Sequence, residues 1–369
     1  MMRTFLTKSA AVGAATLLAL TTAACGGTER EGSGDNGAAN TGFPANSLIG
    51  VALPSKTSEN WVLAGALFTK GLADAGFTSD VQYAGASTTV ADQQAQITAM
   101  VTKGAKVIVI GATDAAQLAT QVEAAKTAGA TVIAYDRLIT NTAAVDYYVA
   151  FDNFKVGVLQ GQALLEGMKA KKPTGPYTIE LFAGSPDDNN ASVFFNGAMS
   201  VLQKEIDAKN VVVGSGQVDF KQVTTDGWKA ENAQKRMDSL LTSTYSTKTL
   251  DGVLSPNDTL ARAILTSVEG AGKPLPIVTG QDSEVESVKS IMAGKQYSTI
   301  NKDTRTLVAE TIKMVKALQA GTPPTTNDTT SYDNGVKVVP AYLLPPMIVT
   351  KKNAAEAYAN DPKLAPYTK

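Results

Sequence analysis

Residues 107–135 read VIVIGATDAAQLATQVEAAKTAGATVIAY, and this stretch sets the expected architecture of the chain. Its first residues, Val107–Ile110, form a continuous apolar run, as expected for a strand that is buried on both faces. A helical run follows around Ala115–Ala128, and Gly129 is the residue type that commonly ends a helix. A second apolar run, Thr131–Tyr135, completes a strand–helix–strand unit. Such a unit predicts a parallel sheet with helices on its faces.

The same alternation extends outward from this stretch in both directions. Upstream, Leu48–Leu53 predicts a strand, and apolar residues recur at helical spacing from Trp61 onward. Downstream, the predicted strands and helices are Tyr177–Phe182, Ala191–Ala208, Val211–Val213, Ala230–Leu241, Leu250–Ser255 and Leu275–Thr279. A chain of 369 residues exceeds the usual size of one core. We therefore expect two α/β lobes of similar plan, with Tyr147–Asn153 as the first crossover between them.

The composition excludes several classes of function. The chain contains no histidine, which rules out a histidine triad, a histidine general base and histidine metal ligands. Its single cysteine, Cys25, cannot form an internal disulfide or a thiolate metal cage. The net charge of −1 provides no general attraction to nucleic acid. We expect no cofactor, no metal and no nucleic-acid partner.

Residues 1–25 have the organisation of a secretion signal. Arg3 and Lys8 precede the apolar run Ala10–Leu20, which is short for a membrane-spanning helix. Small residues then lead to Cys25, in the manner of a bacterial lipobox, where the cysteine becomes the lipidated first residue. Ordinary secretion with an incidental cysteine is the alternative. The sequence favours lipidation, because its only cysteine stands where the motif requires one.

Residues 26–46 predict a flexible tether, because they are rich in glycine, asparagine and charge and contain almost nothing to bury. A diacyl-modified cysteine carries more than one acyl chain, which is enough for stable membrane anchoring. The N-terminal segments therefore predict a secreted globule that is held at the outer face of the cell membrane or in the periplasm.

Polar side chains follow the apolar runs, and ligands of open α/β sheets bind beyond the carboxyl ends of the strands. These residues are Asp136 and Arg137, Asp187 to Asn190, Asn257 and Asp258, Gln281 and Asp282, and Lys302 and Asp303. The set suits a sugar, because carboxylates accept hydrogen bonds from hydroxyls, cations donate to them and amides do both. Trp61 and Trp228 stand at comparable positions, where their rings can pack on a sugar. Each single position also has an ordinary interpretation as a turn former, a helix cap or a core residue.

The motifs, taken together and in this order, resemble those of the periplasmic sugar-binding proteins of the ribose, xylose and galactose type. Within that family they are similar to the xylose and multiple-sugar receptors of ABC transporters. The resemblance covers residues 47–350. Its motifs are Ala134-Tyr135-Asp136-Arg137-Leu138-Ile139, Phe151-Asp152-Asn153, Gly184-Ser185-Pro186-Asp187-Asp188-Asn189-Asn190-Ala191, Asp226-Gly227-Trp228, Ser255-Pro256-Asn257-Asp258, Gly280-Gln281-Asp282-Ser283 and Tyr332-Asp333-Asn334-Gly335-Val336-Lys337.

This resemblance implies two Rossmann-like lobes, each a parallel sheet flanked by helices, which three hinge crossovers join. The N-terminal lobe would comprise residues 47–153 and 303–333. The C-terminal lobe would comprise residues 154–302 and 334–369. The sugar would lie between the two lobes.

The resemblance also implies a set of sugar-binding residues. The first lobe would contribute Asp136 and Arg137, and Lys302 would lie at a crossover. The second lobe would contribute Asn190, Asn257 and Asp282, with Asp188 as a further candidate, and Trp61 and Trp228 would enclose the sugar ring. Relatives usually carry arginine just before the tryptophan of the first helix, where this chain has Asn60. Asn60 is therefore either a ligand contact that alters the choice of sugar or a cap of a helix that begins at Trp61.

The implied function is capture of a monosaccharide of the xylose, glucose, galactose or arabinose class by hinge closure, without chemistry. The protein, a monomer, would deliver the sugar to a membrane ABC permease. A sugar sensor that presents the closed form to a chemoreceptor or a sensor kinase is the alternative. A glycosidase using Asp187 and Asp188 is disfavoured, because adjacent residues rarely face each other across a bond. A sugar-sensing repressor is excluded, because a signal segment stands where a DNA-binding domain would be.

Overall fold

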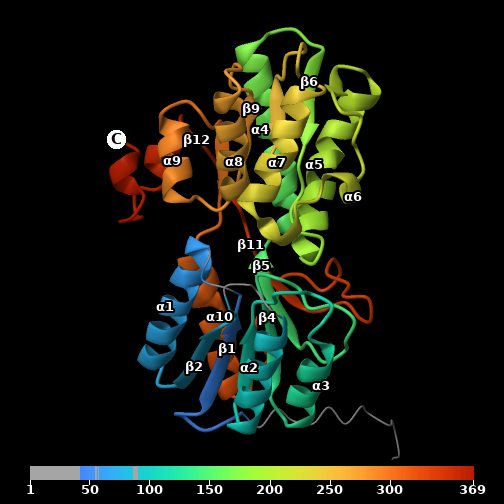
Figure 1. The fold of residues 1–369 in the computed structure, drawn as a ribbon. Coiled ribbons are helices and arrows are strands. Elements are labelled where there is room, and N and C mark those ends of the chain that lie inside the picture. The colour runs from blue at the N-terminus through green and yellow to red at the C-terminus, as the bar shows by residue number, and fades with distance from the viewer. Residues whose placement is uncertain (1–41, 55, 57, 86–89) are drawn as a thin grey trace, which may run out of the picture. The chain divides into compact units, whose positions relative to one another are not determined.

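The computed structural model describes residues 42–369 with the exception of 55, 57 and 86–89, and all of them fall within one compact unit. They form two α/β lobes, each built around its own parallel sheet (Figure 1). The predicted signal segment, Cys25 and residues 26–41 of the predicted tether lie outside the described residues. None of the described helices is long and apolar enough to span a membrane.

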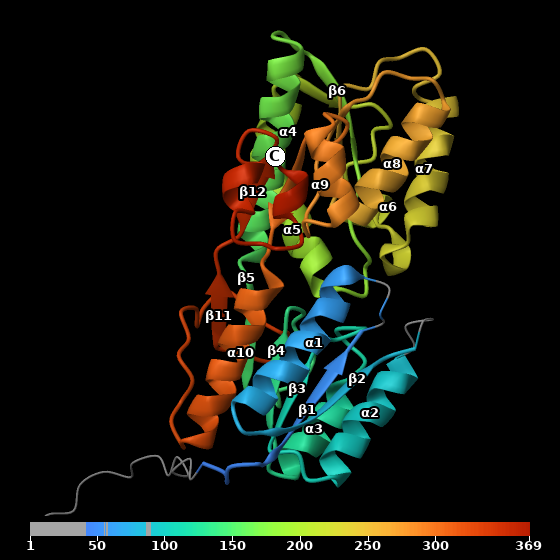
Figure 2. The same ribbon diagram turned by 90° about the vertical axis from the view of Figure 1, so that its left-hand side faces the viewer.

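The first lobe contains a six-stranded, all-parallel sheet in the order β11-β5-β4-β3-β1-β2. Its strands are β1 (Leu48–Leu53), β2 (Thr78–Tyr83), β3 (Val107–Ile110), β4 (Thr131–Tyr135), β5 (Tyr147–Phe151) and β11 (Ala341–Leu344). Its helices are α1 (Glu59–Asp74), α2 (Val90–Thr102), α3 (Ala119–Thr127) and α10 (Thr304–Gln319). The helices α1 and α10 cover one face of the sheet, and α2 and α3 cover the other (Figure 2).

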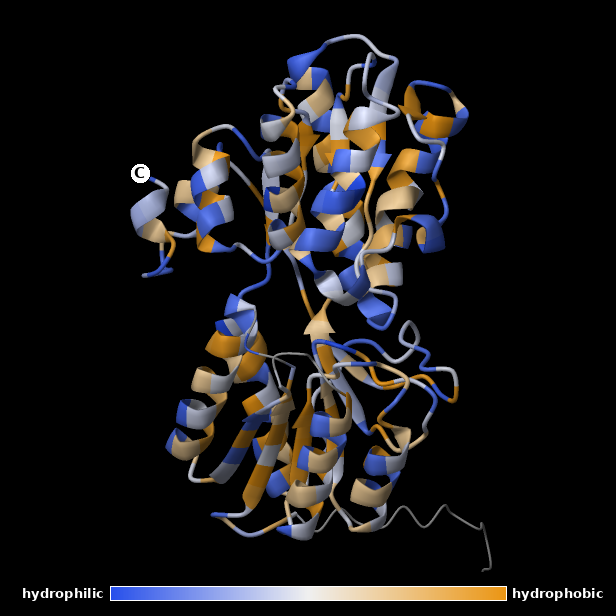
Figure 3. Cartoon of the chain, in the orientation of Figure 1, coloured by the Kyte–Doolittle hydropathy of each residue, from blue (hydrophilic) through white to orange (hydrophobic). Residues whose placement is uncertain are grey.

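Alternation along the strands explains why helices cover both faces of this sheet. In β3, Val107 and Val109 pack under α1 and α10, whereas Ile108 and Ile110 pack under α2 and α3. Successive side chains of a strand point to opposite faces, so a continuous apolar run requires cover on both sides. The colouring by hydropathy shows this apolar sheet between helices of mixed character (Figure 3).

The second lobe contains a four-stranded parallel sheet in the order β7-β6-β8-β9 and a two-stranded antiparallel sheet of β10 and β12. Its strands are β6 (Tyr177–Leu181), β7 (Val211–Val213), β8 (Gly252–Leu254), β9 (Ile277–Val278), β10 (Ser298–Asn301) and β12 (Met347–Thr350). Its helices are α4 (Asn153–Lys171), α5 (Asn189–Asp207), α6 (Phe220–Val223), η1 (Asp226–Trp228), α7 (Ala230–Thr242), α8 (Asp258–Gly270), α9 (Val285–Met292), α11 (Ala354–Ala357) and η2 (Ala365–Tyr367). One apolar cluster joins α4 and α5 to the sheet, and another joins α7 and α8 to it.

Three connections between the lobes occur within the described residues, from β5 to α4, from β10 to α10 and from β11 to β12. The first matches the expected position, although Tyr147–Phe151 forms strand β5 before the chain crosses at Asp152. The predicted assignment of residues 334–369 to the second lobe is wrong in its first part. Strand β11 pairs with β5 in the first sheet, so the chain crosses after Leu344.

A second difference concerns the helix predicted over Ala115–Ala128. Helix α3 begins at Ala119. The carboxylate of Asp114 accepts hydrogen bonds from the Ala116 N–H and the Gln117 side chain, and the Ala115 N–H donates to the carbonyl of Asp187. These contacts hold the preceding residues in a bend, because an Asp side chain that bonds nearby backbone competes with the helix.

Candidate ligand-binding site

A cavity of about 420 Å³ lies where the two lobes meet. This volume falls within the range of small-molecule binding sites. All ten residues that the sequence suggested as ligand contacts line it, namely Asn60, Trp61, Asp136, Arg137, Asp188, Asn190, Trp228, Asn257, Asp282 and Lys302. The cavity thus brings together side chains from the first helix, from the ends of β4, β6, β8 and β9, from η1 and from the crossover after β10. Their role as sugar ligands stays a prediction.

Trp61 forms a wall of the cavity on the side of the first lobe. It lies in the first turn of α1, and its ring packs edge-on against Tyr135 with centroids 6.1 Å apart. The guanidinium carbon of Arg137 lies 5.4 Å from the ring centroid, a cation–π arrangement. Gly111 follows β3, and a Cβ there would come within 3.0 Å of the indole. Residues at the end of the first sheet therefore fix the position of this ring.

Trp228 forms a wall on the side of the second lobe. Its indole Nε1 donates a hydrogen bond to Oδ2 of Asp188 at 3.2 Å. The ring lies directly over Gly184, where an added Cβ would come within 2.1 Å of Cη2. Only glycine at position 184 admits the ring in this position. The two tryptophans of the chain thus line one cavity from opposite lobes.

Arg137 and Asp188 form an ion pair that joins the lobes. Nε of Arg137 lies 3.0 Å from Oδ2 of Asp188, and both side chains are largely buried. Arg137 also donates to the carbonyl of Ala112, whereas Oδ1 of Asp188 caps α5 by accepting from the Asn190 N–H. Because both oxygens of Asp188 are engaged, this carboxylate holds Arg137 and Trp228 in position.

Asp136 presents a carboxylate to the cavity. Its backbone adopts the left-handed conformation (φ 62°), and its carbonyl accepts hydrogen bonds from Tyr148 Oη at 2.7 Å and Asn190 Nδ2 at 2.8 Å. The carboxylate itself has no hydrogen-bond or ion-pair partner among the described residues. Burial raises the pKa of Asp136, and the charges of Lys302 and Arg137 oppose this rise. This carboxylate can therefore accept a hydrogen bond from a hydroxyl of a ligand.

Lys302 and Asp282 form a second ion pair, in which Nζ lies 3.1 Å from Oδ1. The ammonium also lies 5.4 Å from the ring centroid of Phe194. Burial alone would lower the pKa of Lys302, but Asp282, Asp136 and Asp188 outweigh it and raise that pKa. Lys302 therefore stays charged, and its nearby carboxylates hold it in place.

The two asparagines of the second lobe differ in what they leave for a ligand. Asn190 donates to the carbonyl of Asp136, and its Oδ1 accepts from Asn153 Nδ2 at 3.0 Å. Its amide is therefore taken up by contacts beside the first crossover. Asn257 caps α8 through Oδ1, which accepts from the Leu260 N–H. Its Nδ2 has no partner in the described part of the chain and remains a donor for a ligand.

Asn60 does not cap a helix. Helix α1 begins at Glu59 with Ser58 as its N-cap, so the expected start at Trp61 is wrong by two residues. Nδ2 of Asn60 lies 3.4 Å from the carbonyl oxygen of Asp282 in the opposite lobe. This geometry favours the alternative in which Asn60 belongs to the cavity.

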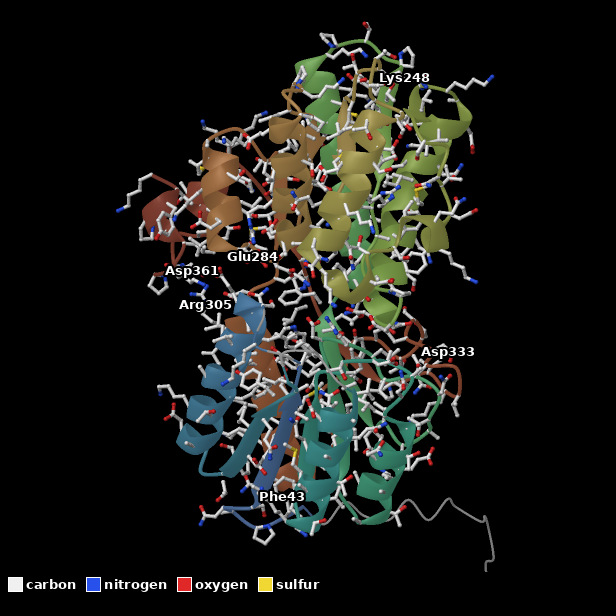
Figure 4. All side chains as sticks on the ribbon, in the orientation of Figure 1. Phe43, Lys248, Glu284, Arg305, Asp333 and Asp361 are labelled. Atoms are coloured by element: carbon white, nitrogen blue, oxygen red, sulfur yellow. The ribbon has the colours of Figure 1, made fainter. Side chains whose placement is uncertain are left out.

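Several lining residues were not among the predicted ligand contacts, including Phe151, Phe194, Gln281, Glu284 and Thr304. Gln281 directly precedes Asp282, and its buried Oε1 has no partner among the described residues. Its place after an apolar run was visible in the sequence. Glu284, labelled in Figure 4, pairs with Arg262 at 2.5 Å. Nothing in the sequence marks that pair, because the two residues come from different helical segments.

The adjacent acids considered as a glycosidase pair, Asp187 and Asp188, lie in different surroundings. Asp187 is exposed at the rim, whereas Asp188 is buried and engaged with Arg137 and Trp228. No group of three or more acidic or cysteine side chains suited to a metal ion occurs among the residues described. The site offers hydrogen-bond donors, acceptors and two indole faces.

Two α/β lobes joined by three connections, with a polar cavity between them, define the class of two-lobed ligand-binding proteins. Residues 49–323 match the family described as the periplasmic binding protein domain. The chain belongs to this family, and the resemblance found in the sequence is confirmed.

Relatives and a solved structure agree with this assignment. The chain is 51% identical to the multiple sugar-binding periplasmic receptor ChvE of Rhizobium radiobacter, over 83% of this chain and 87% of that one. It is 35% identical to the D-xylose-binding periplasmic protein of Escherichia coli (strain K12), over 85% and 89% of the two chains. An ABC transporter solute-binding protein from Clostridium phytofermentans, with bound β-D-glucose, is 41% identical and matches with a TM-score of 0.83, over 88% of this chain and all of that one.

Proposed function

We propose that this protein is the extracytoplasmic solute-binding component of an ABC importer and captures a monosaccharide of the xylose, glucose, galactose or arabinose class. The observation that carries the proposal is the pair of indoles that line one cavity from opposite lobes, with charged and amide groups between them. Aromatic faces and paired polar groups are what a sugar needs. The relatives named for multiple sugars and xylose, and the structure with glucose, support the same class.

Capture operates through hinge closure. The sugar contacts both lobes, so it binds the closed arrangement better and shifts the population towards it. The contacts Arg137–Asp188 and Asn60–Asp282 already cross from lobe to lobe at the cavity. The ligand needs no chemical step, and the protein is a receptor rather than an enzyme.

A screen of aldopentoses and aldohexoses tests the sugar assignment. A bound monosaccharide should raise the melting temperature and change the tryptophan fluorescence, because both tryptophans line the cavity. At a ligand concentration of 100 times Kd, linkage stabilises the folded chain by about 2.7 kcal/mol. Absence of any shift with pentoses or hexoses at millimolar concentration would contradict the assignment.

Lipid anchoring at Cys25 is part of the same proposal. It rests on the order of charged, apolar and small residues before the only cysteine. Mass spectrometry of the membrane fraction should find a mature chain that begins at a diacylated Cys25. A mature chain that begins elsewhere and lacks lipid would disprove it.

Delivery to a membrane permease and a monomeric state complete the proposal. Cells that lack the protein should lose high-affinity uptake of the radiolabelled sugar, and light scattering of the purified receptor should give the mass of one chain. Normal uptake in those cells would instead favour a sensory role.

A further inference from the structure

We propose that the cavity selects neutral sugars and excludes sugars that carry a carboxylate, such as uronic acids. This inference rests on the proposed function and specifies the chemical class of its ligand. The reason lies in how the charged groups of the cavity are already paired with one another.

Both largely buried cations of the cavity are engaged by carboxylates. Arg137 is held by Asp188 at 3.0 Å, and Lys302 is held by Asp282 at 3.1 Å. Arg137 also donates a hydrogen bond to the carbonyl of Ala112. A carboxylate on the ligand would therefore meet cations whose charges are already balanced by buried carboxylates. A further anion would lose its hydration in this site without an unpaired buried cation to compensate its charge, which is unfavourable.

One buried carboxylate is in excess. The buried and half-buried charged groups at the cavity are the acids Asp136, Asp188, Asp282 and Glu284 and the cations Arg137, Lys302 and, behind Glu284, Arg262. The ion pairs account for every one of these acids except Asp136. Its carboxylate faces the cavity without a hydrogen-bond or ion-pair partner among the described residues. It can accept hydrogen bonds from hydroxyls but repels a second carboxylate.

Helix N-termini, which often bind anions, are closed here. The side chains of Asp188, Asn257 and Asp303 cap α5, α8 and α10 by accepting from backbone N–H groups. The N-termini of α1, α7 and α9 lack such a cap bond, but their first turns carry Glu59, Glu231 and Glu286. Because an anion is favoured by free N–H groups and disfavoured by a nearby carboxylate at a helix start, none of these six N-termini favours one. The exposed rim adds Asp187 and Glu231 against Lys229 alone.

Matched ligand pairs test the proposal by titration calorimetry near neutral pH. D-Glucose is compared with D-glucuronate and D-glucuronamide, and D-galactose with D-galacturonate. Like charges a few Å apart in a partly buried site should weaken the acid by about tenfold to 100-fold relative to its parent sugar. The amide has the shape of the acid without its charge, so it should bind within a few-fold of the parent.

A cation added at position 60 provides a second test. Asn60 faces Asp282 through a single long contact with its carbonyl, so Asn60→Arg introduces a guanidinium with no carboxylate partner reserved for it. The ratio of acid to parent Kd should fall by about tenfold in Asn60→Arg and stay unchanged in the neutral control Asn60→Gln.

The outcomes separate this inference from the function on which it rests. Uronates that bind as tightly as their parent sugars would overturn it, and so would an amide as weak as the acid, because shape rather than charge would then decide. If no neutral sugar binds at all, the proposed function fails and the inference fails with it.

Discussion

Asp136 combines a left-handed backbone with a carboxylate that faces the cavity. Its backbone is fixed by hydrogen bonds from Tyr148 and Asn190 to its carbonyl and by its own N–H, which donates to the carbonyl of Val149. The side chain contributes to none of these bonds, so the fold and the ligand use different parts of the same residue. Asp and Asn are the residues besides glycine that tolerate this conformation best.

Asp136→Asn therefore isolates the charge from the fold. The variant should lower sugar affinity at least about tenfold, because hydrogen bonds to a charged acceptor contribute about 1.5–3 kcal/mol. Its melting temperature without sugar should stay the same or rise, because burial disfavours the ionised carboxylate. Calorimetry and thermal unfolding measure the two effects.

Asp238 provides a matched control on the outer surface of α7. Asp238→Asn removes the same charge away from the cavity and should change neither quantity. Sugar affinity that is equal in Asp136→Asn and Asp238→Asn would remove Asp136 from the site.

Among the elements, the central strands of the first lobe were predicted most accurately, whereas its edge strand β2 was not predicted. Val107–Ile110 and Thr131–Tyr135 match β3 and β4 residue for residue, because a buried parallel strand carries a continuous apolar run. Strand β11 escaped notice because it pairs with β5 from the far end of the chain. The sequence around β11 does not indicate which strand it pairs with, since the same apolar residues would also fit a strand in the second lobe.

The site shows the same division between local and distant information. The residue types at the strand ends were readable, because the topology of parallel sheets places them at one edge. Which of them are free for a ligand was not readable. The pairing of Arg137 with Asp188 and the use of Asn190 beside a crossover depend on side chains that meet only in the folded chain.

For the molecule as a whole, the same residues shape the cavity and join the lobes. Arg137–Asp188 and Asn190–Asp136 cross between lobes inside the cavity, whereas Arg305 reaches Asp361 at 3.1 Å outside it (Figure 4). Changes in the cavity are therefore expected to alter both affinity and the balance between open and closed arrangements.

Buried carboxylates behind the cavity make the stability of the molecule depend on pH. Asp258 is fully buried, and its oxygens accept hydrogen bonds from Gln296, Thr299 and the Glu284 N–H. Burial, with the nearby charges of Glu284 and Asp282, raises the pKa of Asp258 well above its ordinary value. Burial likewise raises the pKa of Glu284, against the opposing charge of Arg262.

A carboxyl group whose pKa is higher in the folded chain than in the unfolded chain holds its proton more tightly when folded. Its contribution to stability is complete below the unfolded pKa, near 4, and is lost as the pH rises through the folded pKa. The free energy of unfolding should therefore fall as the pH rises above the unfolded pKa, by up to about 1.4 kcal/mol per pH unit for each such group. Asp258→Asn removes one titrating group, so the wild type should show the steeper fall. Urea unfolding across this range measures both slopes, with Asp238→Asn expected to keep the wild-type slope. Equal slopes in Asp258→Asn and the wild type would show that Asp258 does not keep its proton in the folded chain, and that the donors around it hold the ionised form instead.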